Sequence, residues 1–348
     1  MDILFVEALG KPLWMWLAFV ALVLVLLAFD LGVLHRKTHE IGVKESLWLS
    51  AFYIGLGVAF AGWVWQMMGE TAATQYLTGF VVEKSLAMDN IFVIATIFAY
   101  FGIPRLYQHR VLVYGILGVI VLRAIMIGAG AAVINEFEWI LYIFGAFLLF
   151  TGIKMLTLGD TEYDVSKNPV LKFARRRLRV TDALVGERFF VRRSEPTTGR
   201  IVLFATPLFL ALIMVELADV IFAVDSIPAI FAITTDPYVV YTSNIFAILG
   251  LRALYFAIAA MMHRFVYLET ALAVVLIFIG GKIFAAELIG LEKVPPSLSL
   301  GITLAILATG IVASLLKTRH VPSQDVLAIA PADATASANS PGGKGSSA

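Results

Sequence analysis

Long apolar runs alternate with short polar segments along most of this chain, and each run has about the length that crosses a bilayer. A helical apolar stretch of about 20 residues spans a hydrocarbon core of roughly 30 Å. Backbone groups in lipid must be satisfied within their own segment, so each run is predicted to be a helix. The nine predicted spans cover residues 12–34, 45–67, 73–101, 110–134, 138–158, 201–232, 238–262, 266–290 and 297–316.

Composition supports the same class, since 60% of the residues are hydrophobic and only 15% are charged. Soluble domains carry nearer a quarter charged residues. We therefore expect an all-α, polytopic bundle of membrane helices. Its predicted organisation is spans one to five in 1–158, a basic cytoplasmic loop at 159–200, spans six to nine in 201–316 and a disordered cytoplasmic tail at 317–348.

Lysine and arginine are concentrated in every second loop. Arg36 and Lys37 follow the first span, Arg105 follows the third and the long loop 159–200 follows the fifth, whereas the loops between them carry few bases. The positive-inside rule therefore predicts an external N-terminus and a cytoplasmic C-terminus. No further basic patch suggests a nucleic acid as partner, and the bilayer itself is the expected surroundings.

The basic loop 159–200 contains its own structural signals. Asn168 followed by Pro169 predicts the start of a short helix, and 188–192 is expected to pair with 200–202 as a hairpin. The arginines of the short helix have two interpretations, which are contact with anionic lipid and positive-inside topology alone.

Three landmarks recur in order with a nearly constant spacing of about 128 to 130 residues. Asp89 recurs as Asp219, Arg123 recurs as Arg252, and Gly152 recurs as Gly280. Because the orientation makes spans three and six run in opposite directions, spans 3–5 and 6–8 are predicted to form an inverted repeat. In transporters this arrangement places a binding site between the two halves at mid-membrane.

Acidic and amide side chains interrupt the apolar pattern of both repeats. A charge at mid-membrane costs about 2.5–3.5 kcal/mol on insertion scales, so such residues need partners. Oxygen ligands suit Mn²⁺, Mg²⁺ or Ca²⁺, and the absence of cysteine and of buried histidine argues against Cu⁺ and Zn²⁺. The candidate metal-binding residues are Glu83, Asp89, Asn90, Glu216, Asp219, Asp225 and Ser226.

Two features bear on how this site would be built. Pro228 cannot donate to the Val224 carbonyl, so a helix break around 223–226 is expected to turn Asp225 inward. Arg123 and Arg252 are expected to support the site by charge pairing.

The same charged residues also have purely structural interpretations. Arg123 with Asp89, and Arg252 with Asp219, are alternatively structural ion pairs.

Two more such alternatives concern single positions. Glu83 and Lys84 alternatively lie near a helix end with their charged groups in the interface, and Asp30 is more typical of helix packing or a counter-ion than of a ligand.

At these residues the chain resembles a known family. The motifs Glu-Lys-Ser-Leu-Ala-Met-Asp-Asn-Ile-Phe-Val at 83–93 and Glu-Leu-Ala-Asp-Val-Ile-Phe-Ala-Val-Asp-Ser-Ile-Pro-Ala at 216–229 look like those of the TerC family of integral membrane proteins. Residues 142–152 and 189–191 match its Alx-like branch. The resemblance implies a nine-span protein of the bacterial inner membrane, a link to tellurium resistance and, for the Alx-like branch, export of Mn²⁺.

Two hypotheses of function follow. The first is an exporter of a divalent metal cation, with Mn²⁺ as the expected cargo, exchange for protons as the expected energy source and no resident cofactor. Its ligands would be Asp89, Asp219 and Asp225, and Glu83 or Glu216 would take up protons when the metal leaves. The second is a non-transporting membrane scaffold or stress-response protein with structural buried ion pairs. Tellurite transport fits poorly because carboxylates repel an anion, and no nucleophile–base set suggests an enzyme or a catalytic residue.

Overall fold

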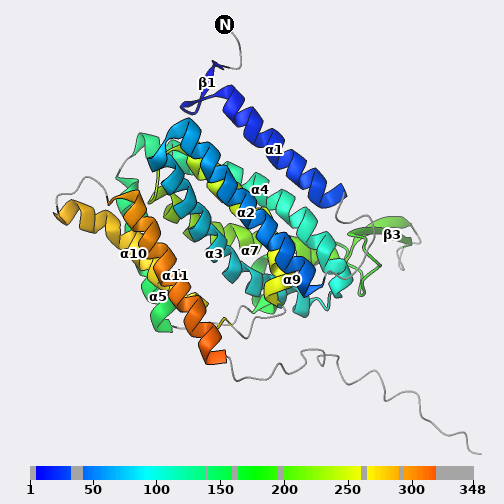
Figure 1. Ribbon diagram of the computed structural model, residues 1–348. Coiled ribbons are helices and arrows are strands. Elements are labelled where there is room, and N and C mark those ends of the chain that lie inside the picture. Colours follow the sequence, from blue (N-terminus) through cyan, green and yellow to red (C-terminus); the bar gives the residue numbers. More distant parts are fainter. Residues whose placement is uncertain are drawn as a thin grey trace, which may run out of the picture.

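The computed structural model describes residues 5–32, 42–137, 139–158, 164–194, 200–259, 265–289 and 294–318. Within these ranges it is a bundle of α-helices with two small β-hairpins (Figure 1). The helices are α1 (Leu13–Gly32), α2 (Val43–Met68), α3 (Glu70–Tyr100), α4 (Arg105–Glu136), α5 (Ile140–Leu158), α6 (Pro169–Arg177), α7 (Pro207–Phe231), α8 (Pro237–Ile248), α9 (Leu251–Ala259), α10 (Leu268–Ile289) and α11 (Pro296–Thr318). A short 3₁₀ helix, η2, covers Val165–Lys167.

The helices confirm a polytopic membrane protein. In the described part of the chain, seven are long and apolar enough to span a membrane, namely α1, α2, α4, α5, α7, α10 and α11, and the bent pair α8–α9 would make an eighth. Helix α3 has 31 residues and is long enough to span a membrane. It is not among the seven because its charged residues lower its hydropathy. The count of nine spans, the orientation and the domain limits stay predictions, and 319–348 lie outside the described residues.

The loop before α7 confirms the predicted hairpin and corrects one boundary. Strand β3 (Phe190–Ser194) pairs antiparallel with β4 (Ile201–Ala205), so the sixth span begins at Pro207 rather than at 201. A second hairpin, β1 (Glu7–Ala8) with β2 (Lys11–Pro12), precedes α1. As expected, Asn168 caps α6 by accepting hydrogen bonds from the first-turn backbone amides.

Helix α3 lies inside the bundle and packs against α2, α7, α8 and α11, while α4 packs on α7 and α5 on α10. Figure 1 shows α1 along one flank and α5, α10 and α11 gathered along the other. Under a two-fold relation of the halves, α3 would correspond to α7, α4 to α8–α9 and α5 to α10. The contact of α3 with α8 would then have its counterpart in the contact of α4 with α7. This packing is what such a relation would produce, and the inverted repeat stays a prediction.

Glycines allow α5 and α10 to approach closely. A Cβ atom added at Gly280 would lie 2.6 Å from the carbonyl oxygen of Gly145, and one at Gly152 would lie 2.7 Å from that of Ala273. Small residues at such contacts let membrane helices pack backbone to backbone. The recurrence of Gly152 as Gly280 in the sequence therefore coincides with one helix–helix interface.

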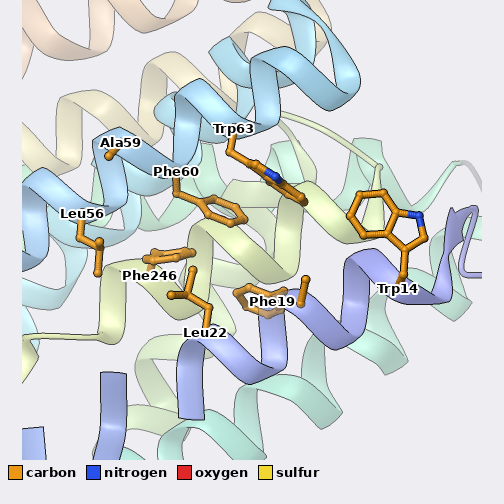
Figure 2. A pocket seen from close by; sticks show the side chains of 9 residues that line it. Trp14, Phe19, Leu22, Leu56, Ala59, Phe60, Trp63 and Phe246 are labelled. Atoms are coloured by element: carbon orange, nitrogen blue, oxygen red, sulfur yellow. The ribbon is translucent and has the colours of Figure 1, made fainter. Parts of the chain in front are cut away.

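An apolar cavity of about 300 Å³ lies where α1, α2 and α8 meet. Figure 2 shows Phe19 of α1, Phe60 and Trp63 of α2 and Phe246 of α8 around it. None of the residues that line it has a side-chain oxygen, so it offers a metal cation no carboxylate, amide or hydroxyl ligand.

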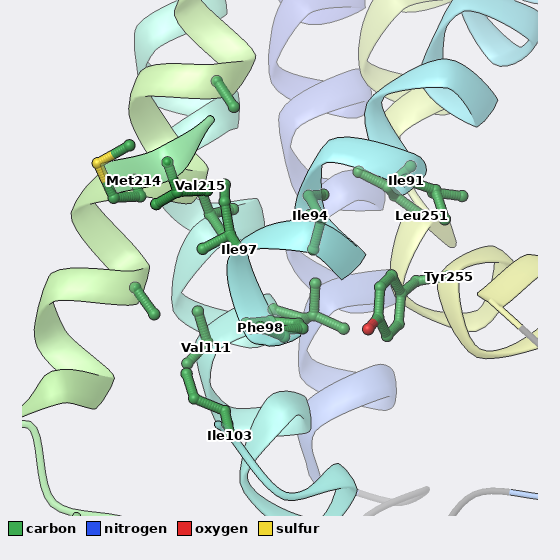
Figure 3. Close-up of a cluster of buried hydrophobic side chains, with 14 of the residues drawn as sticks. Ile91, Ile94, Ile97, Phe98, Ile103, Val111, Met214, Val215, Leu251 and Tyr255 are labelled. Carbon is green, nitrogen blue, oxygen red and sulfur yellow. The ribbon is translucent and has the colours of Figure 1, made fainter. Parts of the chain in front are cut away.

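The core beside the predicted site is also apolar. Figure 3 shows one face of α3, with Ile91, Ile94 and Phe98, turned toward α4, α7 and α9. Phe98 meets Tyr255 of α9 edge to face, with ring centroids 5.6 Å apart. This packing holds the C-terminal half of α3, and the polar residue Asn90 directly precedes it in the chain.

Candidate functional site

Arg123 of α4 is the centre of a buried polar cluster between α3, α4, α7 and α8. Its side chain is only 3% exposed. Its Nε and Nη2 donate to the two oxygens of Asp219 at 3.1 and 2.9 Å, which is the bidentate geometry of strong guanidinium–carboxylate pairs. Its Nη1 contacts Glu83 and donates to Ser226 Oγ at 3.1 Å and Asn244 Oδ1 at 3.3 Å.

Two amides complete the cluster by donating to its carboxylates. Asn90 Nδ2 donates to Asp219 Oδ1 at 3.2 Å, and Asn244 Nδ2 donates to Glu83 Oε2 at 3.0 Å. Glu83 and Asn90 are seven residues apart on α3, as are Asp219 and Ser226 on α7, and this spacing puts each pair on one helix face. The local sequence therefore aims two polar residues from each helix at the same interior point.

The cluster holds more negative than positive charge. One guanidinium faces the two carboxylates of Glu83 and Asp219, so the ionised cluster carries a net charge of −1. Glu216, one turn before Asp219, adds a third carboxyl group close by. Its Oε2 is buried without a hydrogen-bond partner in the described structure. Gly118 of α4 makes room for it, because a Cβ atom there would overlap the Glu216 carboxylate.

Asp225 does not join the cluster, and the expected helix break before Pro228 is wrong. Helix α7 is continuous from Pro207 to Phe231, with Pro228 in its last turn. Asp225 is six residues beyond Asp219, which turns it roughly 120° around the helix axis. It accepts a hydrogen bond from Thr151 Oγ1 of α5 at 3.3 Å instead.

The alternative ion pairs, Arg123 with Asp89 and Arg252 with Asp219, are not the pairs that the structure shows. Arg123 bonds Glu83 and Asp219, and Asp89 is not among its partners. Asp89 is half-buried on α3, next to Asn90 but about 100° around the axis. Arg123 therefore reaches from one predicted repeat to an acid of the other.

Arg252, in turn, pairs with Asp30 of α1, and its Nη1 lies 2.7 Å from His109 Nε2. Asp30 is thus a counter-ion that links α1 to α9, in agreement with its structural interpretation. Asp219, the partner of Arg252 in the alternative interpretation, is bonded to Arg123.

Two buried polar residues beside the predicted ligands were not among the candidates. Asn244 bonds both Glu83 and Arg123, and its only signal was an amide inside an apolar run. For Lys84 the alternative was a position near a helix end together with Glu83, but the two residues are only 6% and 2% exposed. Lys84 Nζ donates to the backbone carbonyls of Ala247 in α8 and of Leu249 between α8 and α9.

In its present arrangement the cluster is held by an arginine and not arranged as a metal site. No group of three or more His, Cys, Asp or Glu side chains that could hold a metal ion occurs in the described part of the chain. Around Arg123 the structure brings together Glu83, Asn90, Asp219 and Ser226 of the seven predicted ligands. Glu216 lies one turn away, while Asp89 and Asp225 lie outside the cluster's hydrogen bonds.

The fold and this cluster define a polytopic helical membrane protein with a charged network held in its interior. The model of the family described as "Integral membrane protein TerC family" matches residues 68–321. The chain therefore belongs to the TerC family, as the two acidic motifs predicted.

Several relatives resemble nearly the whole chain. An uncharacterized membrane protein of Myxococcus xanthus is 45% identical over 91% of this chain and 97% of its own length. A protein of Escherichia coli strain K12 named "Putative membrane-bound redox modulator Alx" is 45% identical over 90% of this chain and 98% of its own length. This likeness agrees with the Alx-like branch. No solved structure matches the chain.

Proposed function

We propose that this protein transports a divalent metal cation across the bacterial inner membrane, with Mn²⁺ as its exported cargo. The observation that carries the proposal is the buried cluster around Arg123. There, two carboxylates, two amides and a hydroxyl from α3, α7 and α8 surround the single positive charge that α4 contributes. Ligands of this kind suit Mn²⁺, and they suit an anionic cargo poorly.

In this proposal the guanidinium of Arg123 stands where the cargo binds. A dication needs the oxygens of Asp219 and Glu83, and both are now bonded to Arg123. Metal and arginine therefore compete for the same carboxylates. Arg123 moves aside when the metal enters and closes the empty site when the metal leaves, while the two halves rock against each other around it.

Glu216 is the proposed proton carrier. It lies one turn from Asp219 on α7, and its buried Oε2 has no hydrogen-bond partner in the described structure. Binding a proton there when the metal departs, and losing it when the metal returns, would limit the change in buried charge. Export of the metal would therefore be driven by the exchange of metal for protons. The N-terminus is taken as external and the C-terminus as cytoplasmic.

Purified protein in liposomes tests the assignment. Mn²⁺ flux is followed with a fluorescent indicator inside the vesicles, for the wild type, Asp219→Asn and Asp225→Asn. We expect Asp219→Asn to lose flux. Asp225→Asn, the same exchange on the same helix but outside the cluster, keeps most of it. Wild-type flux no faster than in protein-free liposomes, or full flux in Asp219→Asn, contradicts the proposal.

A second candidate is a non-transporting scaffold that assists other membrane or stress-response proteins. The observation that favours it is that two buried arginines are paired with acids, Arg123 with the buried Asp219 and Arg252 with the partly buried Asp30, as structural ion pairs are. Its docking surface would be the exposed arginines of α6, Arg175 to Arg177. Absence of flux, with loss of a cellular phenotype when these arginines are replaced by glutamine, supports this candidate. Flux with no effect of that replacement contradicts it.

A further inference from the structure

Lys84 is a buried cation that the proposed transport cycle does not use. Its side chain lies inside the bundle at 6% exposure, and it forms no salt bridge with a carboxylate in the described structure. Its Nζ donates instead to the backbone carbonyls of Ala247 at 2.9 Å and Leu249 at 3.2 Å. A buried ammonium is costly without compensation, so these carbonyls are what stabilises it.

The two carbonyls belong to a helix break. Helix α8 ends at Ile248, Gly250 follows with φ 81°, and α9 begins at Leu251 with its axis bent by 44°. Carbonyls at a helix C-terminus have no intrahelical donors and carry a partial negative charge. The break is built in, because Gly250 has a left-handed backbone and packs directly on Tyr53, 2.6 Å from where a Cβ would lie.

Carbonyl oxygens at broken helices are the groups with which transporters coordinate alkali cations. We propose that the α8–α9 break is a monovalent-cation site and that the Lys84 ammonium is its tethered occupant. The ligand class is a single-charged cation of ammonium size, such as K⁺ or methylammonium. A divalent ion is a poor fit, because the Ala247 and Leu249 carbonyls bring no formal charge.

This site is distinct from the Arg123 cluster but shares its framework. Glu83 and Lys84 are consecutive on α3, and Asn244 and Ala247 are about one turn apart on α8. The cation at the break therefore joins the end of α8 to α3, directly beside the residues that hold Arg123. The proposal does not depend on what the protein transports.

Thermal unfolding of the purified full chain in detergent, without Mn²⁺, tests the site. Midpoints are compared in the chlorides of K⁺, Na⁺, methylammonium and N-methyl-D-glucamine at equal ionic strength. Lys84→Ala removes the ammonium and leaves space for an ion with its water, whereas Lys84→Met removes the charge and fills the space. Lys282→Ala is the matched control, because Lys282 donates to the Ser299 hydroxyl at 3.3 Å rather than to a broken helix.

We expect Lys84→Ala to have a lowered midpoint in N-methyl-D-glucamine and a saturable rise of several degrees in K⁺ and methylammonium, with less in Na⁺. Wild type, Lys84→Met and Lys282→Ala should be indifferent to the choice of cation.

A Lys84→Ala midpoint that is equal in all four salts overturns the proposal. So does a failure of Lys84→Ala to accumulate in cells, because the K⁺ of the cytoplasm would then not replace the lysine. Both results leave the Mn²⁺ flux experiment untouched, so the two proposals fail separately.

Discussion

Replacing Arg123 by methionine removes the only cation of the central cluster and leaves Glu83 and Asp219 facing each other. Each carboxylate loses an attraction of about 4 kcal/mol, taking a charge separation of about 4 Å and an effective dielectric constant of about 20. The variant no longer has to desolvate a guanidinium on folding, which offsets several kcal/mol of this loss. Breaking a buried pair by removing one partner costs about 3–5 kcal/mol in measured cases, and we expect a loss of free energy of unfolding in this range.

The assay is the thermal midpoint in detergent at neutral pH, with and without Mn²⁺. If the cluster is a cation site, Arg123→Met exposes two carboxylates, two amides and a hydroxyl to the metal, and Mn²⁺ should recover part of the loss. A triple variant that adds Glu83→Gln and Asp219→Asn is the control, because it removes every charge together. It should be more stable than the single variant and should not respond to Mn²⁺.

Two results would refute this reasoning. Arg123→Met as stable as the wild type would show that the carboxylates do not need the guanidinium. If Arg123→Met is destabilised and its midpoint does not change with Mn²⁺, the ion pair has only a structural role, and the scaffold is favoured.

Other predictions concern single contacts. Gly118→Ala should force the Glu216 carboxylate away from α4 and lower the free energy of unfolding by about 1–3 kcal/mol, as overpacking does. Gly62→Ala on α2, where a Cβ would meet no atom within 4 Å, should cost nothing comparable, and equal midpoints for the two variants would contradict the argument. Asn168→Ala should weaken the start of α6 by about 1 kcal/mol and speed hydrogen exchange of its first-turn amides, whereas unchanged exchange would mean the cap is dispensable.

Local patterns were enough to predict two elements of the loop before α7. The cap at Asn168 and the β3–β4 hairpin depend on residues within a few positions of each other, and both were confirmed. The segment that begins at 201 carried two local signals, one for a membrane helix and one for a hairpin strand. The apolar run from 201 was expected to be helical throughout, but its first five residues pair with β3 because the turn brings the strands together.

Helix breaks show the limit of such local rules. Pro228 predicted a break that does not occur, since it lies in the last turn of α7, where few hydrogen bonds are at stake. The break that does occur, at Gly250, carries no proline. It depends on the side chain of Tyr53 from a distant helix and on the ammonium of Lys84, which no window of sequence around Gly250 contains.

The sequence by itself determined that this is a helical membrane protein of the TerC family with acidic motifs inside its spans, because hydropathy and motif are properties of consecutive residues. Only the tertiary structure decided which charges meet. Asp219 is bonded to Arg123 and not to Arg252, since the partner of a buried charge depends on the distance and rotation between helices, and many arrangements share the same apolar pattern.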